Sequence, residues 1–303
     1  MATALQTPPT AQATPAAVGR PRRAAQYLAR GALLALAVLL LGITAQVVLV
    51  SPLQQRAAQR AGFDSLRASL AEGTAPVAQT DTSGHLLAPG TPLLLLDIPE
   101  LKLHQVVFEG TDSSVLSKGP GHRRDTVLPG QAGTSVIMGR AAAYGGPFGH
   151  LSQLRPGDRF TATTGQGTFT FEVLDLRWAG DRSPAAPAAG TGRLVLVTGT
   201  GYQYLPEGVL RVDADLVGKA ADTPAAAVAA DSVPASEQPM GTDDADLWVM
   251  VLWLQALALV SVLAVWAWNR WGRHQTWIVF APLTAVVGLQ VADQVTRLLP
   301  NLL

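Results

Sequence analysis

Residues 168–176 read TFTFEVLDL, and apolar side chains occupy alternate positions from Phe169 to Val173. This period of two is typical of a β-strand with one buried face. Similar short runs surround it, and Pro- and Gly-containing pairs between them predict turns. The predicted strands are residues 93–98, 105–109, 133–138, 159–164, 167–178, 193–198 and 208–216. Residues 91–218 are therefore predicted to form an all-β barrel or sandwich.

Long uncharged stretches lie outside this region. They predict transmembrane helices at residues 31–50, 247–268 and 276–293, because a span needs about 20 apolar residues. The third stretch is shorter and contains Pro282 and Gly288, so an interfacial helix is its alternative. The first stretch is predicted to be an uncleaved anchor rather than a signal peptide, because it is long for a signal sequence and lacks a clear cleavage site.

Basic residues predict the orientation in the membrane, because Lys and Arg collect on the cytoplasmic side. Arginines precede the first stretch and lie between the second and third, whereas residues 221–246 contain acids and no Lys or Arg. We therefore expect a cytoplasmic N-terminus, with the β domain and the last residue outside.

The remaining segments are predicted from composition and periodicity. Residues 1–30 read as a disordered cytoplasmic tail. Residues 51–90 read as an extracytoplasmic helix, which covers 53–72, and a linker. Residues 219–246 read as an Ala/Pro-rich acidic linker.

The charge balance and the residue inventory exclude several functions. Lys+Arg and Asp+Glu both number 22, and this balance argues against nucleic-acid binding. The chain has no cysteine, which excludes disulfides, thiolate metal sites and a cysteine nucleophile. Isolated histidines such as His104 and His150 show no metal-ligand spacing, so no metal site or other cofactor is predicted.

Short phrases occur along the β region. They are LDIPEL at 96–101, VFEGT at 107–111, LSKGPGH at 116–122, LPGQAGTSVI at 128–137, YGGPF at 144–148 and PGD at 156–158. In this order they resemble the sortase family, most closely the actinobacterial-type sortases, and the resemblance covers residues 95–217. The resemblance implies an eight-stranded β-barrel in a bacterial cell membrane. It also implies transpeptidation by cysteine, histidine and arginine on sorting-signal peptides.

The sequence departs from the family at the catalytic positions. Arg140 stands at the position of the histidine, and Gly199 stands at that of the cysteine. Val209 aligns with the arginine, although Arg211 would keep the same strand face. Glycine has no nucleophile and arginine does not accept a proton. The barrel is therefore predicted to be a pseudoenzyme.

Other polar residues are candidates for binding. Thr198 and Thr200 flank Gly199 and are either ordinary strand-end threonines or an unusual nucleophile. Arg140 either projects into a surviving groove, where it would favour carboxylates or peptide carbonyls, or lies on the surface near a loop. Arg211 and His122, which matches a non-catalytic histidine of the family, complete the candidate groove.

The sequence thus predicts a membrane-anchored binding or scaffold subunit in cell-envelope protein assembly. Its partners would be the lipid bilayer and an envelope protein or peptide, and the oligomeric state stays open. One alternative is a transpeptidase or hydrolase that uses Thr198 or Thr200. A sensor is a weaker alternative, because the cytoplasmic parts are short.

Overall fold

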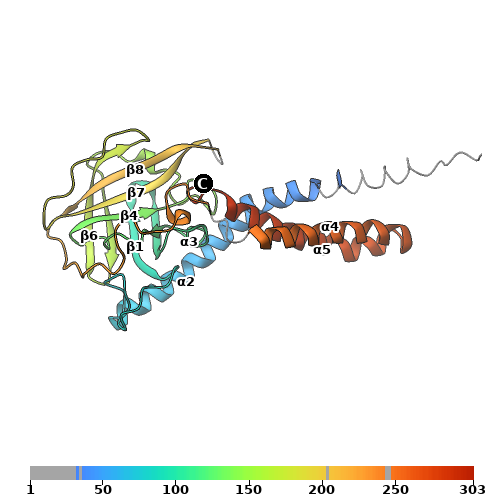
Figure 1. Ribbon diagram of the computed structural model, residues 1–303, viewed down its shortest axis with the longest axis horizontal. Helices are drawn as coiled ribbons and strands as arrows, with labels where there is room; N and C mark the ends of the chain where they lie inside the picture. Colours follow the sequence, from blue (N-terminus) through green and yellow to red (C-terminus); the bar gives the residue numbers. More distant parts are fainter. Residues whose placement is uncertain (1–31, 34–35, 203–204, 243–246) are drawn as a thin grey trace, which may run out of the picture.

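The computed structural model describes residues 32–33, 36–202, 205–242 and 247–303. A closed barrel lies at one end of the molecule and long helices extend from it (Figure 1). The order of strands around the barrel is β1-β2-β3-β4-β7-β8-β6-β5. The strands are β1 Pro92–Ile98, β2 Leu103–Glu109, β3 Gly121–His122, β4 Gly133–Met138, β5 Arg159–Thr164, β6 Gly167–Arg177, β7 Gly192–Tyr202 and β8 Leu205–Val217.

The barrel confirms the predicted fold class, and each predicted run forms a strand. The bounds of β4 and β5 agree with the prediction. The sequence analysis missed β3, because only two residues of this strand pair with its neighbours and no alternation is visible over that length. It also ended β7 too early and began β8 too late, because their ladder continues past Gly199 to Tyr202 and Leu205.

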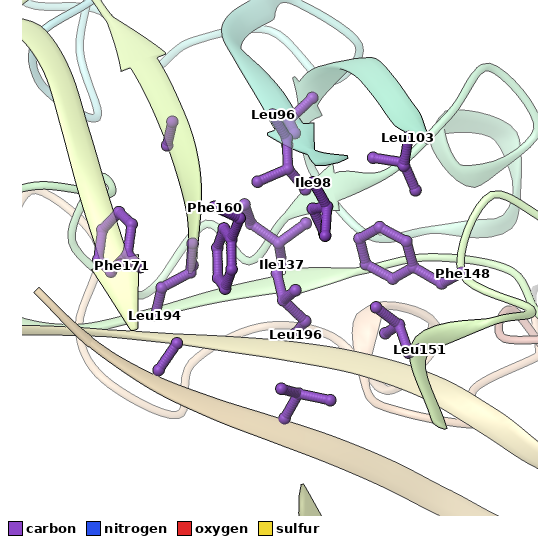
Figure 2. Packing of buried hydrophobic residues seen from close by; sticks show 14 of the residues in the cluster. Leu96, Ile98, Leu103, Ile137, Phe148, Leu151, Phe160, Phe171, Leu194 and Leu196 are labelled. Atoms are coloured by element: carbon purple, nitrogen blue, oxygen red, sulfur yellow. The ribbon is translucent and has the colours of Figure 1, made fainter. Parts of the chain in front are cut away.

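The inner face of the barrel is filled with aliphatic and aromatic side chains (Figure 2). Phe160 and Phe171 stack with ring centroids 5.8 Å apart. Along β7, Leu194 and Leu196 belong to this core, whereas Val195 and Val197 belong to a second cluster with Leu302. Since side chains alternate along a strand, the second cluster lies on the outer face of β7.

Three helices are long and apolar enough to cross a membrane: Leu36–Glu72, α4 Leu247–Arg270 and α5 Arg273–Leu298. The first contains a π-helical turn, η1 Gln46–Val50, followed by α2 Ser51–Glu72. The predicted helix at 53–72 is therefore continuous with the first apolar stretch. The third helix is longer than predicted, because it continues on both sides of 276–293. Residues 1–30 lie outside the described residues.

Helix α2 packs along the barrel wall. Leu66 is buried with Val106 and Phe108, and Gln59 pairs with the backbone of β2. Its Oε1 accepts from Val106 N at 2.7 Å, and its Nε2 donates to Val106 O at 3.0 Å. Gln59 thereby satisfies backbone groups at the edge where β2 pairs with the short β3.

The predicted linker at 219–246 differs from the expectation in its described part, which lies against the barrel. Ala221 bridges to Gln131, and Asp231 pairs with Arg123 at 3.1 Å. The segment then forms η4 Ala235–Glu237, where Glu237 is buried 3.6 Å from Arg124. Burial raises the pKa of Glu237. The low-complexity composition did not reveal these contacts, because they depend on distant barrel residues.

The remaining short helices are η2 Pro99–Leu101, α3 Ser113–Leu116 and η3 Leu151–Gln153.

Replacing Leu196 by Ala is expected to destabilise the barrel by about 2–5 kcal/mol, because it leaves a cavity in a fully buried core. Leu174→Ala on β6 is the matched control, since Leu174 is 44% exposed, and its effect should stay within about 0.5 kcal/mol. Urea unfolding of the intact chain in detergent, followed by protease resistance of the barrel, measures both. Equal losses for the two variants would contradict the assigned core.

Candidate functional site

The parallel pair β4–β7 and the antiparallel pair β7–β8 bring Arg140, Gly199 and Val209 to one end of the barrel. Gly139 N donates to Val197 O at 2.9 Å, so Arg140 directly follows the last β4–β7 contact. Gly199 pairs with Val209 across β7 and β8. The sequence-based placement of these residues around one site is therefore consistent with the strand register.

Gly199 faces a backbone segment that follows α5, residues 299–303, which we call the post-α5 turn. Leu303 N donates to Pro300 O at 3.0 Å, which closes the turn. A Cβ at position 199 would lie 3.1 Å from Leu302 O, closer than ordinary van der Waals contact. The φ of Gly199 lies outside the left-handed region, so its backbone does not require glycine. A side chain at this position would instead require Leu302 O to shift by a few tenths of an ångström.

Arg140 is fully buried beside the same turn. Its Nη1 donates to Leu303 O at 3.2 Å, and its Nη2 donates to Ser113 Oγ at 2.6 Å and Ser113 O at 3.2 Å. The alternative of a surface arginine is therefore wrong. Burial lowers the pKa of Arg140 to about 10, so the guanidinium remains a cation at neutral pH and does not act as a base.

A buried polar network joins this site to the long helices. Asp293 of α5 accepts from Gln46 Nε2 at 2.9 Å and Tyr144 OH at 3.4 Å, and from Arg297 Nε at 2.9 Å. Tyr144 adopts a left-handed φ of 52°, and the Arg140 guanidinium carbon lies 5.0 Å from its ring centroid. Burial and the Asp293 carboxylate raise the pKa of Tyr144 to about 12.

Sequence reasoning did not connect Asp293 and Arg297 to the barrel. Their pairing had a signal, since they are four residues apart on one helix. The contacts with Gln46 and Tyr144 had none, because they join residues far apart in the chain. The π-helical turn at Gln46 was equally invisible, although such turns often mark functional positions.

A pocket of about 460 Å³ opens beside the post-α5 turn. Its lining includes Thr198, Thr200 and His150, with Leu303 at its wall. Thr198 is buried, and its Oγ1 has no hydrogen-bond partner among the described residues. His150 Nδ1 lies 3.2 Å from Gln153 Nε2. The pocket thus contains a histidine and hydroxyls, but Thr198 lacks the hydrogen bond to a base that would activate a nucleophile.

His122 and Arg211 do not line this pocket. His122 is fully buried, and its Nδ1 lies 3.0 Å from Glu109 Oε2 while its Nε2 lies 3.0 Å from Val127 O. This contact set is structural. Arg211 is half-buried on the outer face of β8, opposite Val197 and Arg177. Burial and the Arg177 cation lower its pKa. Within the described ranges, no cluster of His, Cys, Asp or Glu suits a metal ion.

Residues 96–214 match the family model described as "Sortase domain". Sortase D of Bacillus subtilis (strain 168) is 31% identical over 83 residues, which are 27% of this chain and 40% of that protein. The chain therefore spans less than half the length of this relative. The barrel and these matches define a sortase-like class of domain.

The chain is also similar to solved structures of sortases. A sortase D5 transpeptidase from Clostridium perfringens is 20% identical, with a TM-score of 0.45 over 54% of this chain and 99% of that one. Sortase C-1 from Actinomyces oris is 28% identical, with a TM-score of 0.38 over 42% and 75%. The family-model match shows that residues 96–214, which contain most of the barrel, are similar to a sortase domain.

The His122–Glu109 contact predicts a large stability effect. His122→Ala leaves the Glu109 carboxylate buried without its partner, so we expect a loss of about 3–5 kcal/mol. His104→Ala is the control, because His104 makes a contact of the same length, 3.0 Å, with Asp97 on the surface. That variant should lose at most about 1 kcal/mol. Urea unfolding measures both, and similar losses would refute the buried structural role.

Proposed function

We propose that this chain is a catalytically inactive sortase-like membrane protein that serves as a binding or scaffold subunit in cell-envelope protein assembly. The observation that carries the proposal is the chemistry at the two matched positions. Gly199 offers no nucleophile, and Arg140 is a buried cation whose Nη atoms donate to backbone and hydroxyl oxygens. The absence of cysteine from the whole chain removes any substitute thiol.

The helices support a membrane location. Three helices of sufficient length and hydropathy support a multi-pass protein of a bacterial cell membrane. The arginines that flank the apolar stretches favour a cytoplasmic N-terminus and an extracytoplasmic barrel. An envelope protein or peptide is the partner class that this location and the sortase-like barrel favour. The Thr198–Thr200 end of β7 and the adjoining pocket are its proposed contact surface.

One observation favours an enzyme as the second candidate. The pocket brings His150 together with Thr198 and Thr200, so a transpeptidase or hydrolase with a threonine nucleophile has its residue types in one place. The unpartnered Thr198 Oγ1 and the contact of His150 with Gln153 argue against it. Arg211, although retained on the expected strand face, lies outside the pocket lining.

Incubation of the purified intact chain with a fluorogenic sorting-signal peptide distinguishes the two candidates. If the chain is catalytically inactive, neither cleavage nor transfer of the peptide should exceed the protein-free blank. An active cysteine sortase serves as the positive control. Thr198→Val, Thr200→Val and His150→Gln should leave this baseline unchanged. Turnover in the intact chain that disappears in any of these variants would establish the enzyme instead.

Crosslinking in intact membranes tests the scaffold role. We expect the barrel to crosslink to a specific envelope protein. Substitutions at the pocket rim, such as Tyr202→Ala, should reduce this product, because Tyr202 is 77% exposed at the proposed contact surface. Leu174→Ala on the exposed face of β6 is the matched control. Recovery of lipids without any protein product would remove the basis of the scaffold proposal.

A further inference from the structure

The post-α5 turn covers the outer face of strands β4 and β7. Leu302 is fully buried among Leu116, Met138, Val195 and Val197, which lie on α3, β4 and β7. The C-terminal end of the chain, which follows α5, lies beside the barrel and not at the far end of the helices (Figure 1). The turn therefore connects a candidate membrane helix directly to the barrel face that holds Arg140 and Gly199.

Hydrogen bonds join the turn to the barrel and to the segment around Gln238. Leu302 O accepts from Ala141 N at 2.8 Å and Leu303 O accepts from Arg140 Nη1 at 3.2 Å. On its other side, Asn301 Nδ2 donates to Thr111 O at 3.0 Å and to Gln238 O at 2.9 Å. Buried backbone carbonyls usually need a hydrogen-bond donor. These hydrogen bonds therefore fix the position of the turn on the barrel, beyond what apolar packing alone would do.

We propose that Arg140 and Gly199 form a binding site for the chain's own post-α5 turn. Gly199 supplies the space for Leu302 O, and Arg140 supplies a charged donor for Leu303 O. Residues at the family's catalytic positions thus hold the barrel onto α5. This site extends beyond the proposed scaffold role and does not depend on it, because the turn would be seated whether or not the adjoining pocket has activity.

Ser113 adds a second link between Arg140 and α5. Ser113 Oγ donates to Arg297 O at 2.7 Å and accepts from Arg140 Nη2 at 2.6 Å. Arg140 therefore contacts α5 through Ser113 and the post-α5 turn directly. Since Arg140 is buried, loss of its donors would leave carbonyl groups without partners and should loosen the turn.

The cysteine-free chain allows a direct test by thiol labelling, since a single introduced cysteine is the only thiol. In the intact protein in detergent, Leu302→Cys should react with a maleimide at least about 100-fold more slowly than Leu174→Cys, because Leu302 is buried and Leu174 is exposed. Adding Gly199→Val or Arg140→Met should increase the labelling rate of Leu302→Cys by at least about tenfold.

Matched second-site variants control for general disturbance. Gly208→Ala places a Cβ at ordinary contact distances of 3.4 Å, and Arg211→Met removes an arginine outside the turn's contacts, so neither should accelerate labelling. Val173→Cys in the barrel core reports folding and should stay protected in each background. If Gly199→Val exposes Val173→Cys as well, then Gly199→Ala and Arg140→Met decide the result.

Two outcomes would overturn the proposal. Leu302→Cys labelled as fast as Leu174→Cys would mean that the turn is not seated. Leu302→Cys that stays equally protected after the Gly199 and Arg140 substitutions would mean that these residues do not hold it. Neither outcome bears on peptide turnover, so the proposed inactive role is judged separately.

Discussion

The close approach of Leu302 O to Gly199 is the constraint on which this site depends. Any side chain at position 199 would press against a carbonyl that already accepts from Ala141 N. The sequence resemblance matches this position to the family's nucleophile, and a Cβ here would lie 3.1 Å from Leu302 O. The glycine thus leaves more room for the seated turn than a larger residue would.

Arg140 complements this arrangement electrostatically. A buried guanidinium is costly unless its donors are satisfied. Oxygens of Ser113 and Leu303 accept from the Nη atoms of Arg140, whereas its Nε has no partner among the described residues. Tyr144 then links the arginine to Asp293, and Asp293 contacts Gln46 at the π-helical turn. The barrel is therefore connected to the first and third long helices through one continuous set of polar contacts.

Local sequence patterns predicted most of the barrel. Alternation in 168–176 and the Pro/Gly turn signals were sufficient for β1, β2 and β4–β8, because these strands are long enough to show a period. Hydropathy likewise predicted the apolar helices. The two-residue β3 gave no period, and the seating of 219–242 had no local signal because its partners are distant in sequence.

The site was predicted less completely than the fold. Family motifs drew attention to Arg140 and Gly199, and in the structure Arg211 lies two residues after Val209 on β8. His122 was expected in the groove and lies instead in a buried pair with Glu109, because a motif gives position in sequence and not contacts. Asn301 and Leu302 were missed altogether, since an apolar segment after a helix does not indicate which distant surface it covers.

Intact-mass analysis after acid quenching tests the central claim most directly. The intact chain is mixed with excess sorting-signal peptide, and a covalent acyl intermediate on this chain would increase its mass by that of the transferred fragment. The account predicts an unchanged mass at every time point. A mass increase that maps to Thr198 or Thr200 would contradict it and show that the pocket beside the post-α5 turn performs acyl transfer.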